Sequence, residues 1–246
     1  DLLDVFLNKK YGFRVECLRK IEAFVAKNAD RVIVPSHYLA GIIKHWGVPE
    51  KQITVISNAV SLSLKNDAKQ ENKETIFLSI GRLVPWKGFR MLIELMHDFP
   101  KAKLYIIGEG PEKKSQISNV KCQMLEDRVF LVGRKTKEEI ASYYKEATLF
   151  LLNTGYEGFS HQLLEVMAAG VPIITTDAGG NKEVVKNGEN ALVARYNEKQ
   201  EWRETIQKLL GSSELRRHLV ENARLTAARY TKETMIERTI EVLKAL

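Results

Sequence analysis

The stretch TLFLLNTGYEGFSHQLLEVMAAGVPIITT, residues 148–176, decides the fold. Its two ends, TLFLL and PIITT, are short and almost wholly apolar, and the segment between them has an apolar spacing typical of a helix. Ser160 is a favourable N-cap, while Gly170 and the nearby Pro172 stop a helix, so we expect a helix over 161–169. Apolar strands on both sides of a helix predict a βαβ unit within a parallel sheet that is covered on both faces.

The same alternation of strand and helix runs from Thr75 onward. Strands are expected at 75–80, 103–107, 128–132, 148–152, 172–176 and 191–194. Helices are expected at about 87–98, 111–119, 136–146, 160–169, 180–187, 198–210, 213–229 and 231–245. The alternation predicts an α/β fold with a doubly wound parallel sheet.

The first 62 residues contain a second, smaller α/β pattern. It comprises a basic helix within 8–27, a strand at 31–35, a helix at 38–47 and a strand at 52–56. Because so short a segment buries too little apolar surface to fold alone, we expect residues 1–62 to be the tail of an earlier α/β domain. We expect a polar linker at 63–74, the main domain at 75–230 and a final helix, 231–246, that packs back on the N-terminal segment.

The composition of the 246 residues, 44% hydrophobic and 28% charged, is that of a folded globular protein. No apolar run approaches the roughly 18–20 residues of a membrane span, and no secretory signal opens the sequence. These features predict a cytoplasmic protein. Cys17 and Cys122 lie outside any CxxC or Cys/His motif, so we predict reduced thiols, and no histidine spacing indicates a metal site.

The formal net charge of +7 favours an anionic partner. Lys and Arg are interspersed with Glu and Asp, without dense basic runs among aromatic residues, which argues against nucleic acid. A phosphorylated small molecule fits this distribution better. The basic amphipathic helix at 8–27 leaves two interpretations open: packing on a neighbouring element, which its pattern favours, and peripheral contact with an anionic membrane.

Glycines follow nearly every predicted strand of the main domain. They are Gly81, Gly108, Gly133, Gly155, Gly158, Gly179 and Gly180. Open α/β sheets bind ligands outside the carboxyl ends of their strands, where glycine lets the backbone approach a ligand closely. Any single glycine is explained as well by a strand-to-helix turn. Five loops in succession favour a ligand-binding edge.

The helix of the opening stretch begins at an expected anion site. The N–H groups of His161, Gln162 and Leu163 lack partners within the helix and carry the positive end of its dipole. Glu157, before the helix, and Glu165, inside it, are hydrogen-bond acceptors, which suits hydroxyl groups. We therefore expect a ligand with a phosphate in the middle and hydroxyl groups at both ends.

A second cationic element follows the first strand of the main domain. Gly81 opens a loop from which Arg82 and Lys87 extend, close to the start of the next helix. Two fixed cations beside a helix N-terminus can hold a diphosphate. Other phosphate motifs are missing: there is no GxxxxGK(S/T) loop, and GEGPEK lacks the third glycine of a dinucleotide fingerprint. No DxD pair is present to hold a divalent metal on the diphosphate.

Four motifs together resemble one known family. They are SIGRLVPWKGF, LYIIGEGP, VFLVGR and EGFSHQLLEVMAAGVPIITTDAGGNKEVV, in this order. They resemble the nucleotide-sugar-binding half of the retaining family 4 glycosyltransferases, whose GT-B fold consists of two facing Rossmann-like domains. The resemblance extends from Arg31 to the end of the sequence, and its most specific feature is two glutamates separated by seven residues.

The resemblance implies a role for each matching residue. Glu165 would bind the ribose hydroxyls and Glu157 the donor sugar, while Arg82 and Lys87 would neutralise the diphosphate as it leaves. Arg82, Lys87 and Glu157 would thus be the catalytic residues. The donor-binding residues would be Gly81, Arg134, which would lie beside the base, Gly158, Phe159, Ser160, His161, Gln162 and Glu165. In this family the sugar is transferred with retention, by attack on the same face, without a metal or another cofactor.

The resemblance also implies what this sequence lacks. The family's first domain carries a glycine-rich loop, a histidine near the reacting sugar and most of the acceptor site, and only its tail, RVIVPSHYLAGIIKHWGV and ITVISNAV, is matched. We therefore expect this chain to bind a nucleotide sugar but to transfer it poorly to a glycan or lipid-linked acceptor without the missing N-terminal domain. Two alternatives stay open: a nucleotide-sugar-binding module without activity of its own, and a sugar-nucleotide epimerase of the same fold.

Overall fold

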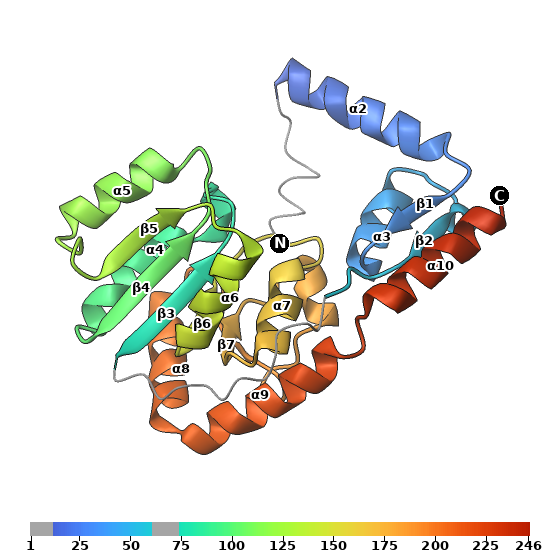
Figure 1. Ribbon diagram of the computed structural model, residues 1–246. Coiled ribbons are helices and arrows are strands. Elements are labelled where there is room, and N and C mark those ends of the chain that lie inside the picture. Colours follow the sequence, from blue (N-terminus) through green and yellow to red (C-terminus); the bar gives the residue numbers. More distant parts are fainter. Residues whose placement is uncertain (1–11, 61–73) are drawn as a thin grey trace.

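The computed structural model describes residues 12–60 and 74–246. Within these residues the chain forms two parallel sheets, one of six strands and one of two (Figure 1). Most of the helices cover the larger sheet. The predicted linker at 63–74 and the start of the predicted helix at 8–27 lie largely outside the described residues.

The larger sheet has the strand order β5-β4-β3-β6-β7-β8, and all neighbouring strands are parallel. Its strands are β3 (Thr75–Ile80), β4 (Ala102–Ile107), β5 (Val129–Gly133), β6 (Leu149–Leu152), β7 (Ile173–Thr175) and β8 (Leu192–Val193). The chain moves outward from β3 to β5 and then returns to the other side of β3 at β6. The carboxyl ends of β3 and β6 therefore form a topological switch point, where open α/β sheets bind their ligands.

Helices cover both faces of this sheet because successive strand residues point to opposite sides. Phe77 of β3 lies in a core with α4 (Phe89–Leu95), α5 (Lys113–Cys122) and α8 (Lys199–Gly211). Leu78 lies in the opposite core, with α6 (Lys137–Glu146), α7 (His161–Ala169) and part of α9 (Ser213–Ala227). The prediction of a doubly wound parallel α/β sheet is confirmed.

Two predicted helices differ in the structure. The expected helix at 87–98 is divided into a 3-10 turn (Pro85–Lys87), α4 and a second 3-10 turn (Met96–Asp98). Gly88, with a left-handed φ of 52°, separates the first turn from α4. The expected helix at 180–187 is only a 3-10 segment, Gly179–Glu183. There the Asn190 side chain accepts from the N–H of Lys186 and donates to the carbonyl of Val184, which replaces helical hydrogen bonds.

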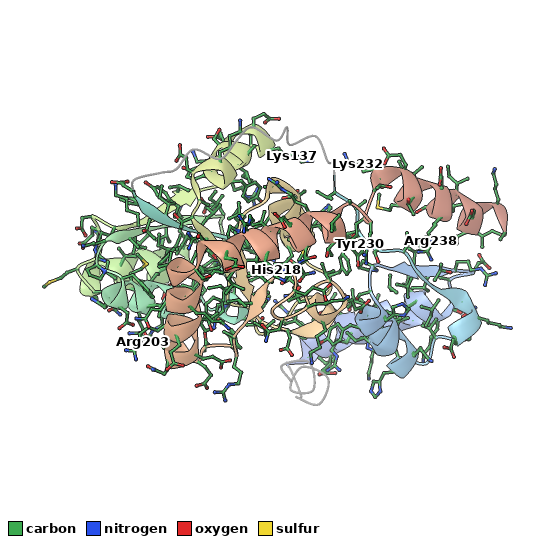
Figure 2. The ribbon with its side chains drawn as sticks, turned by 90° about the horizontal axis from the view of Figure 1, so that it is seen from below. Lys137, Arg203, His218, Tyr230, Lys232 and Arg238 are labelled. Carbon is green, nitrogen blue, oxygen red and sulfur yellow. The ribbon has the colours of Figure 1, made fainter. Side chains whose placement is uncertain are left out.

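The N-terminal part contains α2 (Phe13–Lys27), β1 (Val32–Val34), α3 (His37–His45), a 3-10 turn (Glu50–Gln52) and β2 (Ile53–Val55). Strands β1 and β2 pair in parallel. The final helix, α10 (Lys232–Lys244), runs beside them, and Arg238 donates to the carbonyl of Val55 at 3.0 Å (Figure 2). The N–H of Val60 also donates to the carbonyl of Tyr230, at 2.9 Å. The assignment of residues 1–62 to the tail of a larger domain stays a prediction.

Helix α2 stands apart from the rest of the molecule (Figure 1), and none of its side chains is buried. It exposes Phe13, Leu18, Ile21 and Phe24. Among the described residues no helix has the length and apolarity needed to cross a bilayer.

Candidate functional site

A hollow of about 550 Å³ opens at the carboxyl ends of β3, β4 and β5. The first turn of α7 also contributes to its wall. It is lined by Ile80, Gly81, Arg82, Ile107, Gly108, Glu109, Gly110, Pro111, Arg134, Lys135, Ile140 and Gln162. The hollow lies at the sheet edge where the glycines predicted a ligand site.

Backbone contacts between two loops form the floor of this hollow. The N–H of Gly81 donates to the carbonyl of Ile107, and that of Leu83 donates to the carbonyl of Glu109, both at 3.0 Å. Gly108 has a φ of 144°, and a Cβ at this position would overlap the carbonyl oxygen of Gly81. Glycine is therefore required here for the two loops to touch, so the local turn explains this residue without a ligand.

Some charged side chains that line the hollow have ion-pair partners and others do not. Lys113 pairs with Glu109 at 2.6 Å, and Lys135 pairs with Glu139 at 2.9 Å. Within residues 12–60 and 74–246 the guanidinium groups of Arg82 and Arg134 have no ion-pair or hydrogen-bond partner. Two unpaired cations therefore face one cavity, which favours a ligand with two negative charges.

Lys87 lies beside the hollow and pairs with Glu157. The distance from Nζ to Oε2 is 2.5 Å, and the two side chains are only 10% and 17% exposed. The aliphatic part of Lys87 passes close to Gly81, where a Cβ would meet its Cδ at 3.6 Å. Lys87 thus connects the floor of the hollow to the loop before α7.

The loop that carries Lys87 is held against the end of β6. Asn153 donates to the carbonyl of Gly88 at 3.0 Å and to Oδ1 of Asn197 at 2.8 Å. The N–H of Gly155 donates to the carbonyl of Trp86 at 2.8 Å. Asn153 is fully buried, so these bonds fix the position of the Lys87 loop in a region from which water is excluded.

The loop that carries Glu157 lies between the larger sheet and the N-terminal part. Gly180 donates its N–H to the carbonyl of Glu157 at 2.8 Å, and Ser36 Oγ donates to the carbonyl of Gly158 at 2.7 Å. Burial, and then the charge of Glu157, raise the pKa of the neighbouring Tyr156. The position of Glu157 therefore depends on contacts with both the N-terminal part and the larger sheet.

Helix α7 has the predicted ends, from His161 after the Ser160 cap to Ala169 before Gly170. One detail of the anion-site prediction was wrong, because Leu163 donates its N–H to Ser160 Oγ at 3.4 Å. Within the described residues the N–H groups of His161 and Gln162 remain without a backbone or side-chain acceptor.

Glu165 lies one turn inside α7 and has a partner that the sequence did not indicate. Tyr144 of α6 donates from its hydroxyl to Oε2 of Glu165 at 3.4 Å. Burial, and then the negative charge of Glu165, hold the pKa of Tyr144 above its ordinary value. Tyr144 therefore stays protonated and orients the carboxylate. Nothing in its sequence context distinguishes it from a core tyrosine.

The predicted site residues fall into three groups. Gly81, Arg82, Arg134 and Gln162 line the hollow. Lys87, Glu157 and Glu165 lie outside its lining, with Lys87 and Glu157 paired to each other. Gly158 and His161, which also lie outside it, stand between the two glutamates in the sequence. Phe159 and Ser160 are buried, the first in the core against the ring of Tyr230 and the second as the cap. The binding and catalytic roles of all these residues stay predictions.

Residues 62–226 match the family model described as "Glycosyl transferases group 1". The chain belongs to this family. Residues 6–64 match a second model, "Glycosyltransferase Family 4". The larger sheet thus has the Rossmann-like architecture of GT-B glycosyltransferases.

Relatives of known sequence support this membership. An uncharacterized glycosyltransferase of Methanocaldococcus jannaschii is 29% identical over 91% of this chain and 62% of its own length. The N-acetyl-alpha-D-glucosaminyl L-malate synthase of Bacillus anthracis is 30% identical over 84% of this chain and 57% of its own length. The chain therefore spans less than two thirds of either relative.

Solved structures have the same fold. The sucrose-phosphate synthase of Thermosynechococcus elongatus superposes with a TM-score of 0.86 and 25% identity, over 99% of this chain and 65% of that one. Alr3699/HepE of Anabaena, crystallised with UDP and glucose, superposes with a TM-score of 0.85 and 22% identity, over 92% of this chain and 66% of that one.

Proposed function

We propose that this protein binds a nucleotide-diphosphate sugar and forms the donor-binding part of a retaining glycosyltransferase. The observation that carries the proposal is the hollow in which Arg82 and Arg134 are both without an ion-pair partner among the described residues. A diphosphate supplies the two negative charges that such a site favours. The similarity to Alr3699/HepE, crystallised with UDP and glucose, supports the same ligand class.

We propose that the sugar is transferred with retention, as the family resemblance implies. The bond between the anomeric carbon and the diphosphate oxygen breaks, and the acceptor hydroxyl forms its new bond on the same face and passes its proton to the leaving oxygen. Arg82 and Lys87 stabilise the negative charge that develops on the diphosphate, as fixed cations do in a preorganised site. In our proposal this stabilisation replaces a metal ion, and no other cofactor is needed.

The glutamates bind the hydroxyl groups at the two ends of the donor. Glu157 accepts from the sugar while it remains paired with Lys87, and Glu165, oriented by Tyr144, accepts from the ribose. We propose a glycan or lipid-linked acceptor and a cytoplasmic location, with peripheral membrane contact through α2 as the alternative to packing. Because the chain spans 57–62% of the two relatives above, we propose that full transfer needs the remaining acceptor-binding part.

A thermal-shift and calorimetric screen of UDP, GDP and ADP sugars tests donor binding. A ligand at about 100 times its dissociation constant should stabilise the protein by about 2.7 kcal/mol. Arg82→Gln should weaken binding about tenfold or more, through loss of a charge-assisted contact. Arg195→Gln is the matched control, since Arg195 is exposed and pairs with Glu201. Failure of every nucleotide sugar to bind, or equal effects of the two substitutions, would contradict the proposal.

A further inference from the structure

A second groove, larger than the hollow, lies between α4 and α5. Its volume is about 850 Å³, and it shares no lining residue with the hollow. Gln116, Asn119 and Cys122 line it along α5, and Asn197 lies at one end. The groove also reaches Pro85 and Gly88, which flank Lys87, so an occupant would touch the loop that holds this lysine.

Two side chains of this groove have buried polar atoms without partners. Gln116 is only 6% exposed, and within the described residues its Oε1 has no hydrogen-bond partner. Nδ2 of Asn119 is also buried and lacks an acceptor in that part of the chain. Buried amide groups are rarely left unpaired, so both side chains have unused hydrogen-bonding capacity beside the groove. Gln116 and Asn119 are three residues apart, which places them on one face of α5.

The unpaired atoms indicate the kind of ligand. Gln116 lacks a donor and Asn119 lacks an acceptor, and a hydroxyl group supplies both. Ser115 and Ser118 add further hydroxyl groups to the lining. An array of amides and hydroxyls that can each donate or accept matches a molecule with several neighbouring hydroxyl groups.

The charges of the groove argue against a phosphorylated ligand. Arg90 pairs with Glu94 at 3.0 Å, and Lys199 pairs with Asp98 at 3.4 Å, so both cations are compensated. Glu112, which also lines the groove, adds a negative charge. This balance contrasts with the hollow, where two arginines have no counter-charge among the described residues.

We propose that the groove between α4 and α5 binds an uncharged saccharide, at a site separate from the hollow. Binding there does not depend on the proposed function, because it uses none of the residues assigned to the donor. The site and the hollow can therefore be tested independently.

Cysteine protection tests the site on the unaltered protein. Cys122 is exposed and lines the groove, whereas Cys17 lies on α2. Millimolar maltotriose should slow the alkylation of Cys122 by iodoacetamide and leave that of Cys17 unchanged, as read by mass spectrometry. Glucose and N-acetylglucosamine serve as smaller probes, and glucose 6-phosphate serves as the charged one. Equal alkylation with and without every saccharide, or stronger protection by glucose 6-phosphate, would overturn the proposal.

Substitutions distinguish saccharide binding in the groove from saccharide binding in the hollow. Gln116→Leu should weaken maltotriose binding about tenfold in calorimetry, and the melting temperature should not fall, because the amide oxygen that is removed has no partner. Gln207→Leu on the exposed side of α8 is the matched control and should bind normally. Maltotriose binding that Arg82→Gln abolishes and Gln116→Leu spares would place the sugar in the hollow and overturn the proposal.

Discussion

At the residue scale, the pair of Lys87 and Glu157 combines two charges in a mostly buried position. Removing one member of such a pair leaves the other charge desolvated and unpaired. We expect Lys87→Met to lower the free energy of unfolding by about 3 kcal/mol. The double variant Lys87→Met/Glu157→Gln should recover at least about 1 kcal/mol of this loss. Urea unfolding of the four proteins in this cycle measures both effects, and simply additive losses would show that the pair is not coupled.

One buried tyrosine and three half-buried tyrosines should make the stability of the protein fall at alkaline pH. Burial is the first cause that raises the pKa of Tyr144, Tyr156, Tyr196 and Tyr230. The unfolded chain loses these protons near pH 10, whereas the folded state holds them to higher pH, so stability is lost as pH rises above about 10. Tyr144→Phe should make the alkaline decline shallower in urea unfolding across this range. An unchanged slope would mean that Tyr144 ionises normally in the folded protein.

At the element scale, sequence patterns predicted the ends of most helices and strands, because the residues that determine these ends lie next to them in the sequence. Strand β3 occupies the predicted residues 75–80, since this run is apolar on both faces, and α7 ends where Ser160 and Gly170 predicted. The prediction of a helix after β7 was wrong because the side chain of Asn190, four residues after Lys186 and six after Val184, makes the hydrogen bonds that a helix would make there. Tyr144 and Asn153 were missed for a different reason. Their partners lie 21 and 65 residues away in the sequence, and nothing in a local pattern reports such contacts.

Gly88, which separates the turn of Lys87 from α4, should be costly to replace. Gly88 has a φ of 52°, and an added Cβ would overlap the amide of Asn153. Gly188 also has a positive φ, 77°, but a Cβ there meets nothing within 4 Å. Gly88→Ala should therefore cost about 1–3 kcal/mol more than Gly188→Ala in urea unfolding, and it should weaken donor binding by displacing Lys87. Equal costs for the two alanines would mean that backbone strain alone matters.

At the scale of the whole molecule, hydrogen bonds connect the N-terminal part to the larger sheet. Glu183, at the end of the 3-10 segment after β7, accepts from the N–H groups of His37 and Tyr38 at 3.0 and 2.8 Å. Its carboxylate therefore caps the N-terminus of α3 from the other part of the chain, and Ser36 caps the same helix from within. The loop of Glu157 lies in this junction, so the proposed donor site and the N-terminal part are coupled by position.

Loss of this cap should loosen one part of the molecule and leave the other intact. Glu183→Ala should increase amide hydrogen exchange in α3 and β2, by a local loss of about 1 kcal/mol, because two N–H groups at a helix N-terminus lose their acceptor. Exchange in β3 and β4 should stay unchanged, since their cores do not include this contact. Glu189→Ala is the control, because Glu189 pairs only with the nearby Lys186 in the described chain. Faster exchange in both sheets would mean that the two parts unfold as one cooperative unit, and the junction could then not move independently during donor binding.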